Sequence, residues 1–136
     1  MAGCVSITAA CDNVEPLEAI LIGILGALFY KLAVSMSEKY QIDDPLNVSQ
    51  VHGFCGLWGV IATGLFDKDK GFYHLGDPTF MGIQCIGALA IIAWTSAISF
   101  LFFKLLKKSN RLRIGQIYEI LGMDIVEEGQ ISQWFP

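Results

Sequence analysis

The stretch from Asn47 to Phe66, NVSQVHGFCGLWGVIATGLF, constrains the fold of this chain more than any other part of it. From Val48 it runs 19 residues without a formal charge, and at about 1.5 Å per residue a helix of that length roughly spans the hydrocarbon core of a bilayer. The stretch also holds four glycines, each of which costs a helix in water about 1 kcal/mol relative to alanine. It therefore predicts a helix whose solvent is lipid rather than water.

The composition indicates that the rest of the chain also belongs to a membrane protein. Its 136 residues are 54% hydrophobic and 16% charged, whereas a typical soluble protein is about 25% charged. Apolar stretches predict membrane spans at 17–36, 48–66 and 80–103, followed by a tail at 104–136. We therefore expect a single domain of the all-α membrane class over residues 1–136, with three transmembrane helices that are too few to enclose a pore alone.

Basic residues predict the orientation of these spans. Six lie in or beside the connector 37–47 and the start of the tail, against two on the opposite side: Lys39, Lys104, Lys107, Lys108, Arg111 and Arg113 against Lys68 and Lys70. Because such residues favour the inner side, the tail is expected on the cytosolic or matrix-like side. Apolar residues at Ile114, Ile117 and Leu121 further predict an amphipathic helix in the tail, with Gly122 placed to end it.

Several classes of function are disfavoured. A net charge of −4, with no basic cluster beyond the juxtamembrane run, argues against nucleic acid as a partner. The sequence has no nucleophile beside a base, no phosphate-binding loop and no metal-ligand cluster, so we expect no enzyme, no metal and no cofactor. The four cysteines lack a CxxC pair and are expected to pack in the membrane, with the redox state of Cys4 and Cys11 left open. His74, in a polar loop, is expected to be solvated or at an interface.

His52 is the main candidate for a functional residue. On a helix it shares a face with Gly56, Gly59 and Thr63, so its imidazole overlooks a surface with little side-chain bulk. An ionisable residue inside a membrane span is a functional hypothesis by default, and a histidine that hydrogen-bonds to a neighbouring helix is the structural alternative. The residues alone favour neither the functional nor the structural interpretation of His52. We expect Gly53, Gly56 and Gly59 to be packing positions, with membrane lipid and other membrane subunits as the partners of these faces.

Three motifs resemble one known family. The segments AGCVSITAAC, IDDPLNVSQVHGFCGLWGVIATGLF and, after an LR pair, EILGMDIVEEG are similar in order and spacing to the C-terminal part of the ammonium transporter family (Amt/Mep/Rh). The corresponding family segments read approximately AGLVxITPAC, DDxxDVFxVHGxxGxxGxxxTGxF and LR…E…GLDxxEHGE. The resemblance covers nearly the whole chain and implies a partial ammonium transporter fold.

The resemblance also implies roles for individual residues. Family members are trimers of eleven-helix protomers, each with a narrow hydrophobic pore in which two hydrogen-bonded histidines guide ammonia or deprotonated ammonium. This chain is similar to helices nine to eleven and the cytosolic tail. His52 falls on the second pore histidine, Val48 on a hydrophobic pore-lining position and Asp44 on an acidic position near the cytosolic end.

The chain also departs from the family pattern. Ala9 stands where the family has the proline of ITP, Asn47 replaces the aspartate of DVF, and EGQ, ending at Gln130, replaces HGE. The first pore histidine and the outer recruiting residues belong to earlier helices of the family, which these 136 residues do not include. The 136 residues match only the helices that line one side of the family's pore, and the helices of the other sides are needed to complete it.

These observations lead to two functional hypotheses. The favoured one is a non-transporting structural or accessory subunit of a larger membrane complex, with a mitochondrial respiratory assembly as one candidate. The alternative is the C-terminal piece of a split ammonium or ammonia channel that another chain completes, and a truncated transporter gene is a third interpretation. The mitochondrial inner membrane and the plasma membrane both fit the sequence.

Overall fold

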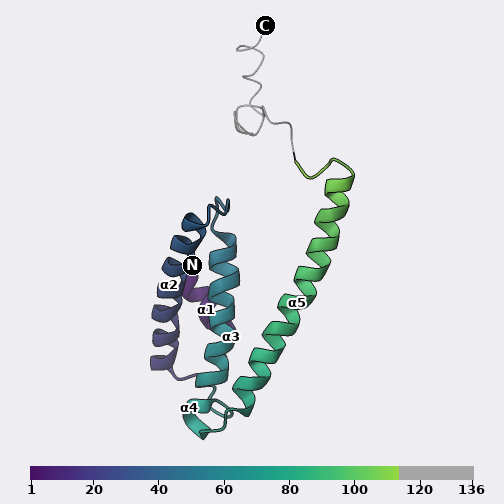
Figure 1. The fold of residues 1–136 in the computed structure, drawn as a ribbon. Helices are drawn as coiled ribbons and strands as arrows, with labels where there is room; N and C mark the ends of the chain where they lie inside the picture. The colour runs from purple at the N-terminus through teal and green to yellow at the C-terminus, as the bar shows by residue number, and fades with distance from the viewer. Residues whose placement is uncertain (114–136) are drawn as a thin grey trace. The chain divides into compact units, whose positions relative to one another are not determined.

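All regular secondary structure in the described part of the chain is helical. In a computed structural model, residues 1–113 are described, and they contain no strand. The chain divides into two units, Met1–Ile92 and the residues from Ala93 onward. The amphipathic tail helix predicted around Ile114 to Gly122 lies outside the described residues. The helices are α1 (Ala2–Thr8), α2 (Pro16–Lys39), η1 (Ser49–Phe54), α3 (Cys55–Phe66), α4 (Phe72–Leu75) and α5 (Thr79–Lys108) (Figure 1).

Two of the helices are long and apolar enough to cross a membrane. Helix α2 has 24 residues and α5 has 30, and the spans predicted at 17–36 and 80–103 fall within them. The third predicted span, 48–66, is helical in two pieces, a π-helical segment η1 of six residues and the 12-residue α3. An all-α membrane fold is thus confirmed, while a crossing of the membrane by η1 and α3 stays a prediction.

Capping interactions define both ends of α2. At its start, the Glu15 N–H donates to the Glu18 carboxylate at 2.9 Å, which satisfies one of the amides that a helix N-terminus leaves without a partner. At its end, the Ile42 N–H donates to the Ser37 carbonyl at 2.9 Å, and Gln41 adopts the left-handed region at φ 52°. This is the Schellman arrangement that turns a chain out of a helix, so α2 ends where the charged connector begins.

Asp44 initiates the helical segment that contains His52. Its carboxylate accepts hydrogen bonds from the Val48 N–H at 3.0 Å, the Ser49 N–H at 2.8 Å and the Ser49 hydroxyl at 2.5 Å. The Ser49 hydroxyl and then the backbone amides hold the pKa of the Asp44 carboxyl below its ordinary value, because they stabilise the charged form. The carboxylate also lies at the positive end of the helix dipole. Asp44 therefore caps this segment.

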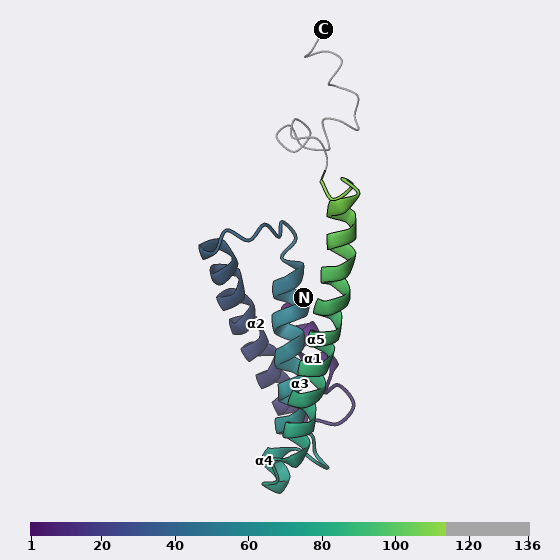
Figure 2. The ribbon, with the colours of Figure 1, turned by 45° about the vertical axis from the view of Figure 1, so that its right-hand side comes forward.

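Helix α1 packs against α2 and α3, and small residues make this possible. Figures 1 and 2 show α2 and α3 running in opposite directions, with α1 beside them. Ser6 of α1 is fully buried between Gly26 of α2 and Gly59 of α3, where an added Cβ on either glycine would collide with Ser6. The sequence does not predict α1, because seven residues are too few to show a helical period.

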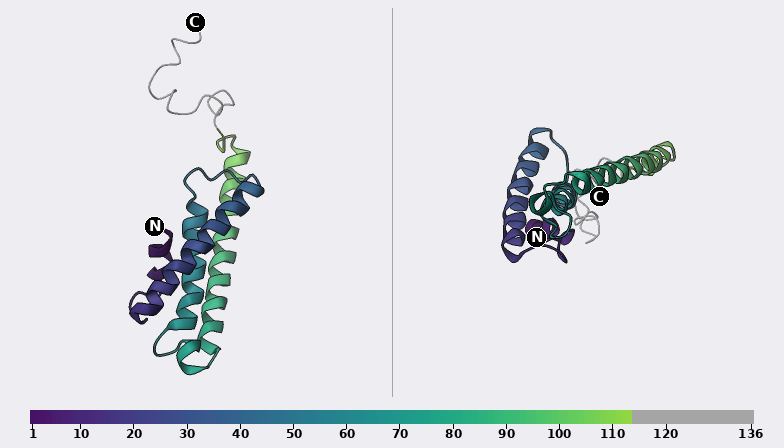
Figure 3. Two further views of the ribbon diagram at one scale, coloured as in Figure 1. Left: turned by 90° about the vertical axis from the view of Figure 1, so that its left-hand side faces the viewer. Right: turned by 90° about the horizontal axis from the view of Figure 1, so that it is seen from below.

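Polar contacts fasten the loop after α3 to the start of α2. The Lys68 N–H donates to the Asn13 carbonyl at 3.0 Å, and Lys68 Nζ lies 3.1 Å from Glu15. His74 Nε2, in α4, lies 2.9 Å from the Glu18 carboxylate, which is almost buried. These contacts hold the loop with α4 at the end of the unit where α2 begins (Figure 3). His74 therefore has a partner that its place in a polar loop did not reveal.

The contact between Ser6 and Gly59 leads to a first prediction. Gly59→Ala is expected to lower the free energy of unfolding by about 1 to 3 kcal/mol, because the added methyl group meets the Ser6 backbone and α1 must move away. Gly56→Ala is the matched control: nothing lies within 4 Å of its Cβ position, so we expect a change within about 0.5 kcal/mol. Denaturant unfolding in mixed micelles, followed by tryptophan fluorescence, measures both. Equal losses for the two variants would contradict this packing.

The cap at Asp44 leads to a second prediction, on pH. Because the folded pKa is lowered, the carboxylate stabilises the fold above its ordinary pKa of 3.8, and this contribution disappears as pH falls through the lowered folded value. Asp44→Asn should therefore lower the melting temperature at pH 7, and the difference from wild type should shrink as pH falls below about 4 and vanish once pH is below the lowered folded pKa. Asp43→Asn, next to it in the connector, is the control and should behave as wild type throughout. A deficit for Asp44→Asn that does not change with pH would exclude a charge-dependent cap.

Candidate functional site: the groove beside His52

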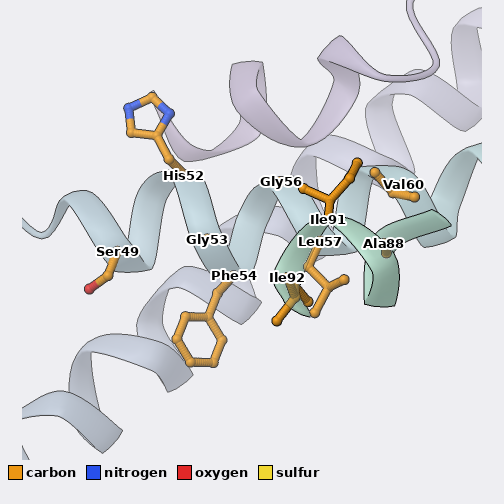
Figure 4. A pocket seen from close by; sticks show the side chains of 10 residues that line it. All are labelled: Ser49, His52, Gly53, Phe54, Gly56, Leu57, Val60, Ala88, Ile91 and Ile92. Carbon is orange, nitrogen blue, oxygen red and sulfur yellow. The ribbon is translucent and has the colours of Figure 1, made fainter. Parts of the chain in front are cut away.

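An apolar groove of about 480 Å³ lies beside His52 in the first unit. Its walls come from η1, from the start of α3 and from the part of α5 that ends at Ile92 (Figure 4). Apart from Ser49 and His52, all of its lining residues are apolar. They are Ser49, His52, Gly53, Phe54, Gly56, Leu57, Val60, Ala88, Ile91 and Ile92.

The His52 imidazole is exposed along this groove. Figure 4 shows it on the opposite side of the helix from the Phe54 ring. Within residues 1–113, the ring makes no hydrogen bond or ion pair. A neutral imidazole has one donor and one acceptor nitrogen, so both are available to a guest molecule or to a neighbouring helix.

The helix that carries His52 has an unusually wide turn. Residues Ser49–Phe54 are π-helical, and at the end of this segment the Cys55 N–H donates to the Gln50 carbonyl, five residues earlier. Turns of this kind are rare and are frequently found at functional sites. The wider turn rotates His52 relative to the α-helix that follows, and it ends where α3 begins at Cys55.

The glycines of this helix do not share one environment, although the sequence placed Gly56 and Gly59 on one face with His52. Gly53 and Gly56 line the groove, and nothing lies within 4 Å of the position of an added Cβ on either. Gly59 faces Ser6 and is buried. The π turn shifts His52 relative to Gly59, and α1 covers only the Gly59 side. A packing role for Gly53 and Gly56 stays a prediction.

The two other predicted site residues lie before the groove. Val48 is half exposed and immediately precedes η1, and it is not among the residues of the described chain that line the groove. Asp44 lies in the connector, where it caps the segment. The structure thus brings together His52, Gly53 and Gly56, and separates Val48 and Asp44 from them. Their pore roles stay predictions from the resemblance.

Two features of the site were missed by sequence reasoning. Ala88, Ile91 and Ile92 line the groove from α5, but one apolar residue of a span looks like any other before the helices are assembled. Gln50 is completely buried, and its position two residues before His52 in an otherwise apolar span was the available signal. An uncharged amide inside a membrane segment needs hydrogen-bond partners there.

The arrangement suits a small guest that can hydrogen-bond. The groove is apolar except for the imidazole and the Ser49 hydroxyl, and an apolar surface disfavours a charged guest because dehydration is costly. Residues 1–113 hold no group of three or more histidine, cysteine or acidic side chains that could bind a metal ion. A neutral imidazole beside an apolar path can donate one hydrogen bond and accept another, which suits binding and proton exchange.

Comparison with known proteins agrees with the resemblance. The sequence model described as the Ammonium Transporter Family matches residues 1–132. Ammonium transporter 1 member 1 of Solanum lycopersicum is 37% identical over 98% of this chain and 30% of its own length. The protein of the same name from Arabidopsis thaliana is 36% identical over 99% of this chain and 30% of its own length. Ammonium transporter Amt2 of Archaeoglobus fulgidus is 34% identical, with 97% and 31% covered.

The match is nearly complete for this chain and partial for its relatives. The chain spans about 30% of the length of these transporters. Members of the family are integral membrane proteins rather than enzymes, in agreement with the two long apolar helices. The resemblance predicted from the motifs is therefore confirmed, and the chain belongs to the ammonium transporter family.

Proposed function

We propose that this chain supplies the C-terminal wall of an ammonium-conducting pore, which is completed by helices that these 136 residues do not include. The observation that carries the proposal is the His52 imidazole, which has no hydrogen-bond partner among residues 1–113 and lies along an open apolar groove. In a membrane, an imidazole with no partner is costly, so the surface that covers the groove must offer it a polar group. A second imidazole and a passing ammonia molecule both meet this need.

The properties of the groove suit this substrate. Ammonium is a charged ion, and moving it intact between apolar walls would forfeit its hydration energy. Neutral ammonia loses far less, and it can donate a hydrogen bond to a ring nitrogen of His52. The glycines at 53 and 56 leave that wall without side chains, so a small guest can approach the backbone closely.

The backbone at Asn47 supports the same proposal. The family has aspartate at this position, and Asn47 adopts the left-handed region with φ of 52°. Asparagine and aspartate are the residues other than glycine that most readily take this conformation. The negative charge that caps the helix comes from Asp44, so the substitution at 47 preserves the local geometry that presents His52.

A structural or accessory subunit of a larger membrane complex is the second candidate. Large apolar side chains on the outward faces of α2 favour it, because lipid or foreign helices must cover them: Leu17, Ile20, Leu21, Ile24, Leu28 and Leu32 are all exposed. A mitochondrial respiratory assembly and a complex of the plasma membrane are both possible settings. In either setting, the basic residues at the end of α2, in the last turns of α5 and directly after α5 favour a tail on the cytosolic or matrix-like side.

The test is reconstitution of the pore. Cells that lack ammonium uptake receive this chain, a family transporter shortened to the helices before the region that matches Ala2, or both parts together. Uptake of labelled methylammonium is expected only with both parts. We expect His52→Gln to reduce it at least about tenfold, because Gln cannot exchange a proton at the groove. His74→Gln, the same substitution in the loop, is the matched control and should retain uptake.

The outcomes separate the two candidates. Uptake that does not change in His52→Gln would exclude a pore role for the imidazole. Native purification provides the complementary measurement. Co-purification with a polypeptide that resembles the earlier family helices supports the pore, whereas co-purification with unrelated membrane subunits, together with no uptake in the reconstitution, would overturn the pore proposal in favour of the accessory role.

A further inference from the structure

Gln50 is the most deeply buried polar side chain in the helix that carries His52. It is 0% exposed, although the surrounding stretch is apolar and its neighbours Val51 and His52 differ widely in exposure. Burying an amide is costly unless each of its polar atoms has a partner. The hydrogen-bond partners of the Gln50 amide therefore show which parts of the unit it connects.

The Gln50 amide joins three separate parts of the unit. Oriented so that each atom faces a suitable partner, its Oε1 accepts from the Ser37 hydroxyl of α2 at 2.6 Å, and its Nε2 donates to Asp44 Oδ2 at 2.8 Å and to the Asn47 carbonyl at 3.2 Å. These groups come from the last turn of α2 and from the connector. One side chain thus links the end of one helix, the capping carboxylate and the start of the next helix.

The main chain of Gln50 takes part in the π-helical segment Ser49–Phe54. Its carbonyl accepts the Cys55 N–H across the π turn, and His52 lies in the middle of that turn. The side chain of Gln50 therefore fixes the π turn to α2, while its carbonyl is an essential part of the turn itself. A movement of Gln50 would change the direction in which the imidazole leaves the helix.

We propose that Gln50 is a positioning residue for His52: its buried amide, held by Ser37 and Asp44, fixes the π turn that directs the imidazole along the groove. The significance of this role for transport rests on the proposed function. The geometric role does not, because it concerns the position of His52 within this chain. Gln50 is not among the residues of 1–113 that line the groove.

The test observes the two histidines directly. The full chain is labelled with ¹⁵N-histidine and placed in lipid nanodiscs, and the two sets of ring signals are assigned with His52→Gln. Gln50→Leu keeps the volume of the side chain but removes its hydrogen bonds, so we expect the His52 signals to shift by more than their line width while those of His74 stay in place. Thr63→Val is the matched control, because within residues 1–113 the Thr63 hydroxyl bonds only to the Gly59 carbonyl of its own helix, and both signals should remain unchanged.

A milder pair of variants covers the case in which Gln50→Leu does not fold. Ser37→Ala removes one partner of the amide and should shift the His52 signals in the same direction, whereas Ser37→Thr keeps the hydroxyl and should restore the wild-type position. In the completed pore, Gln50→Leu should reduce uptake by about tenfold or more, since small displacements of a positioned group have effects of that size.

The results distinguish this inference from the proposed function. If the His52 signals stay in place in both Gln50→Leu and Ser37→Ala while the melting temperature falls, Gln50 only stabilises the fold and the inference is wrong. If those signals shift but the wild-type chain supports no uptake with its complement, the positioning role stands and the pore proposal fails.

Discussion

The need to pair every polar group in the absence of water shapes the first unit of this chain. No buried side-chain nitrogen or oxygen in the described residues lacks a hydrogen-bond partner, even where the partner comes from another helix. The Trp58 indole N–H donates to the Ile22 carbonyl at 3.1 Å, and the amide of Gln50 bridges two helices and a connector. In lipid such pairs hold helices together, because separating them would expose polar atoms to hydrocarbon. The open imidazole of His52 departs from this pattern.

Close packing of small residues complements this pairing. Ser6 fits between Gly26 and Gly59 because neither glycine has a side chain, and α1 can therefore approach the backbones of two helices. Gly53 and Gly56 also lack side chains, but within the described chain nothing lies within 4 Å of the position of an added Cβ on either. In the helical stretch from η1 to α3, Gly59 thus packs against α1, whereas the surface at Gly53 and Gly56, beside His52, stays open.

The sequence predicts the features that depend on length and composition. The spans at 17–36 and 80–103 fall within α2 and α5 because a long apolar run leaves few alternatives in a membrane. His52 could be identified as a candidate functional residue from the sequence, because an ionisable residue within an apolar run is rare. The motifs around Asp44 and His52 then indicated the family, which the comparisons confirm.

The missed features depend on contacts between segments or on local hydrogen bonding. Helix α1 is too short to show a period, and its packing requires glycines that lie far along the chain. A π-helical segment such as Ser49–Phe54 differs from an α-helix in the spacing of its backbone hydrogen bonds, and the residues of both are similar. The link from Gln50 to Ser37 joins residues in different helices, and a pattern of apolar positions contains no information on it. Three features therefore follow only from the three-dimensional structure. They are the π-helical segment, the hydrogen bonds of the buried Gln50 amide and the different surroundings of Gly56 and Gly59.

These features together limit what can cover the groove. A partner helix packed on Gly53 and Gly56 can approach closely only with small or flat side chains, and it must still offer a hydrogen bond to His52. A purely structural partner would gain more stability from filling the groove with apolar side chains, but it would then leave the imidazole without a partner, at a cost of a few kcal/mol. A partner that pairs with the ring and leaves the rest of the groove free avoids this cost. The geometry therefore favours a surface that preserves the groove over one that fills it.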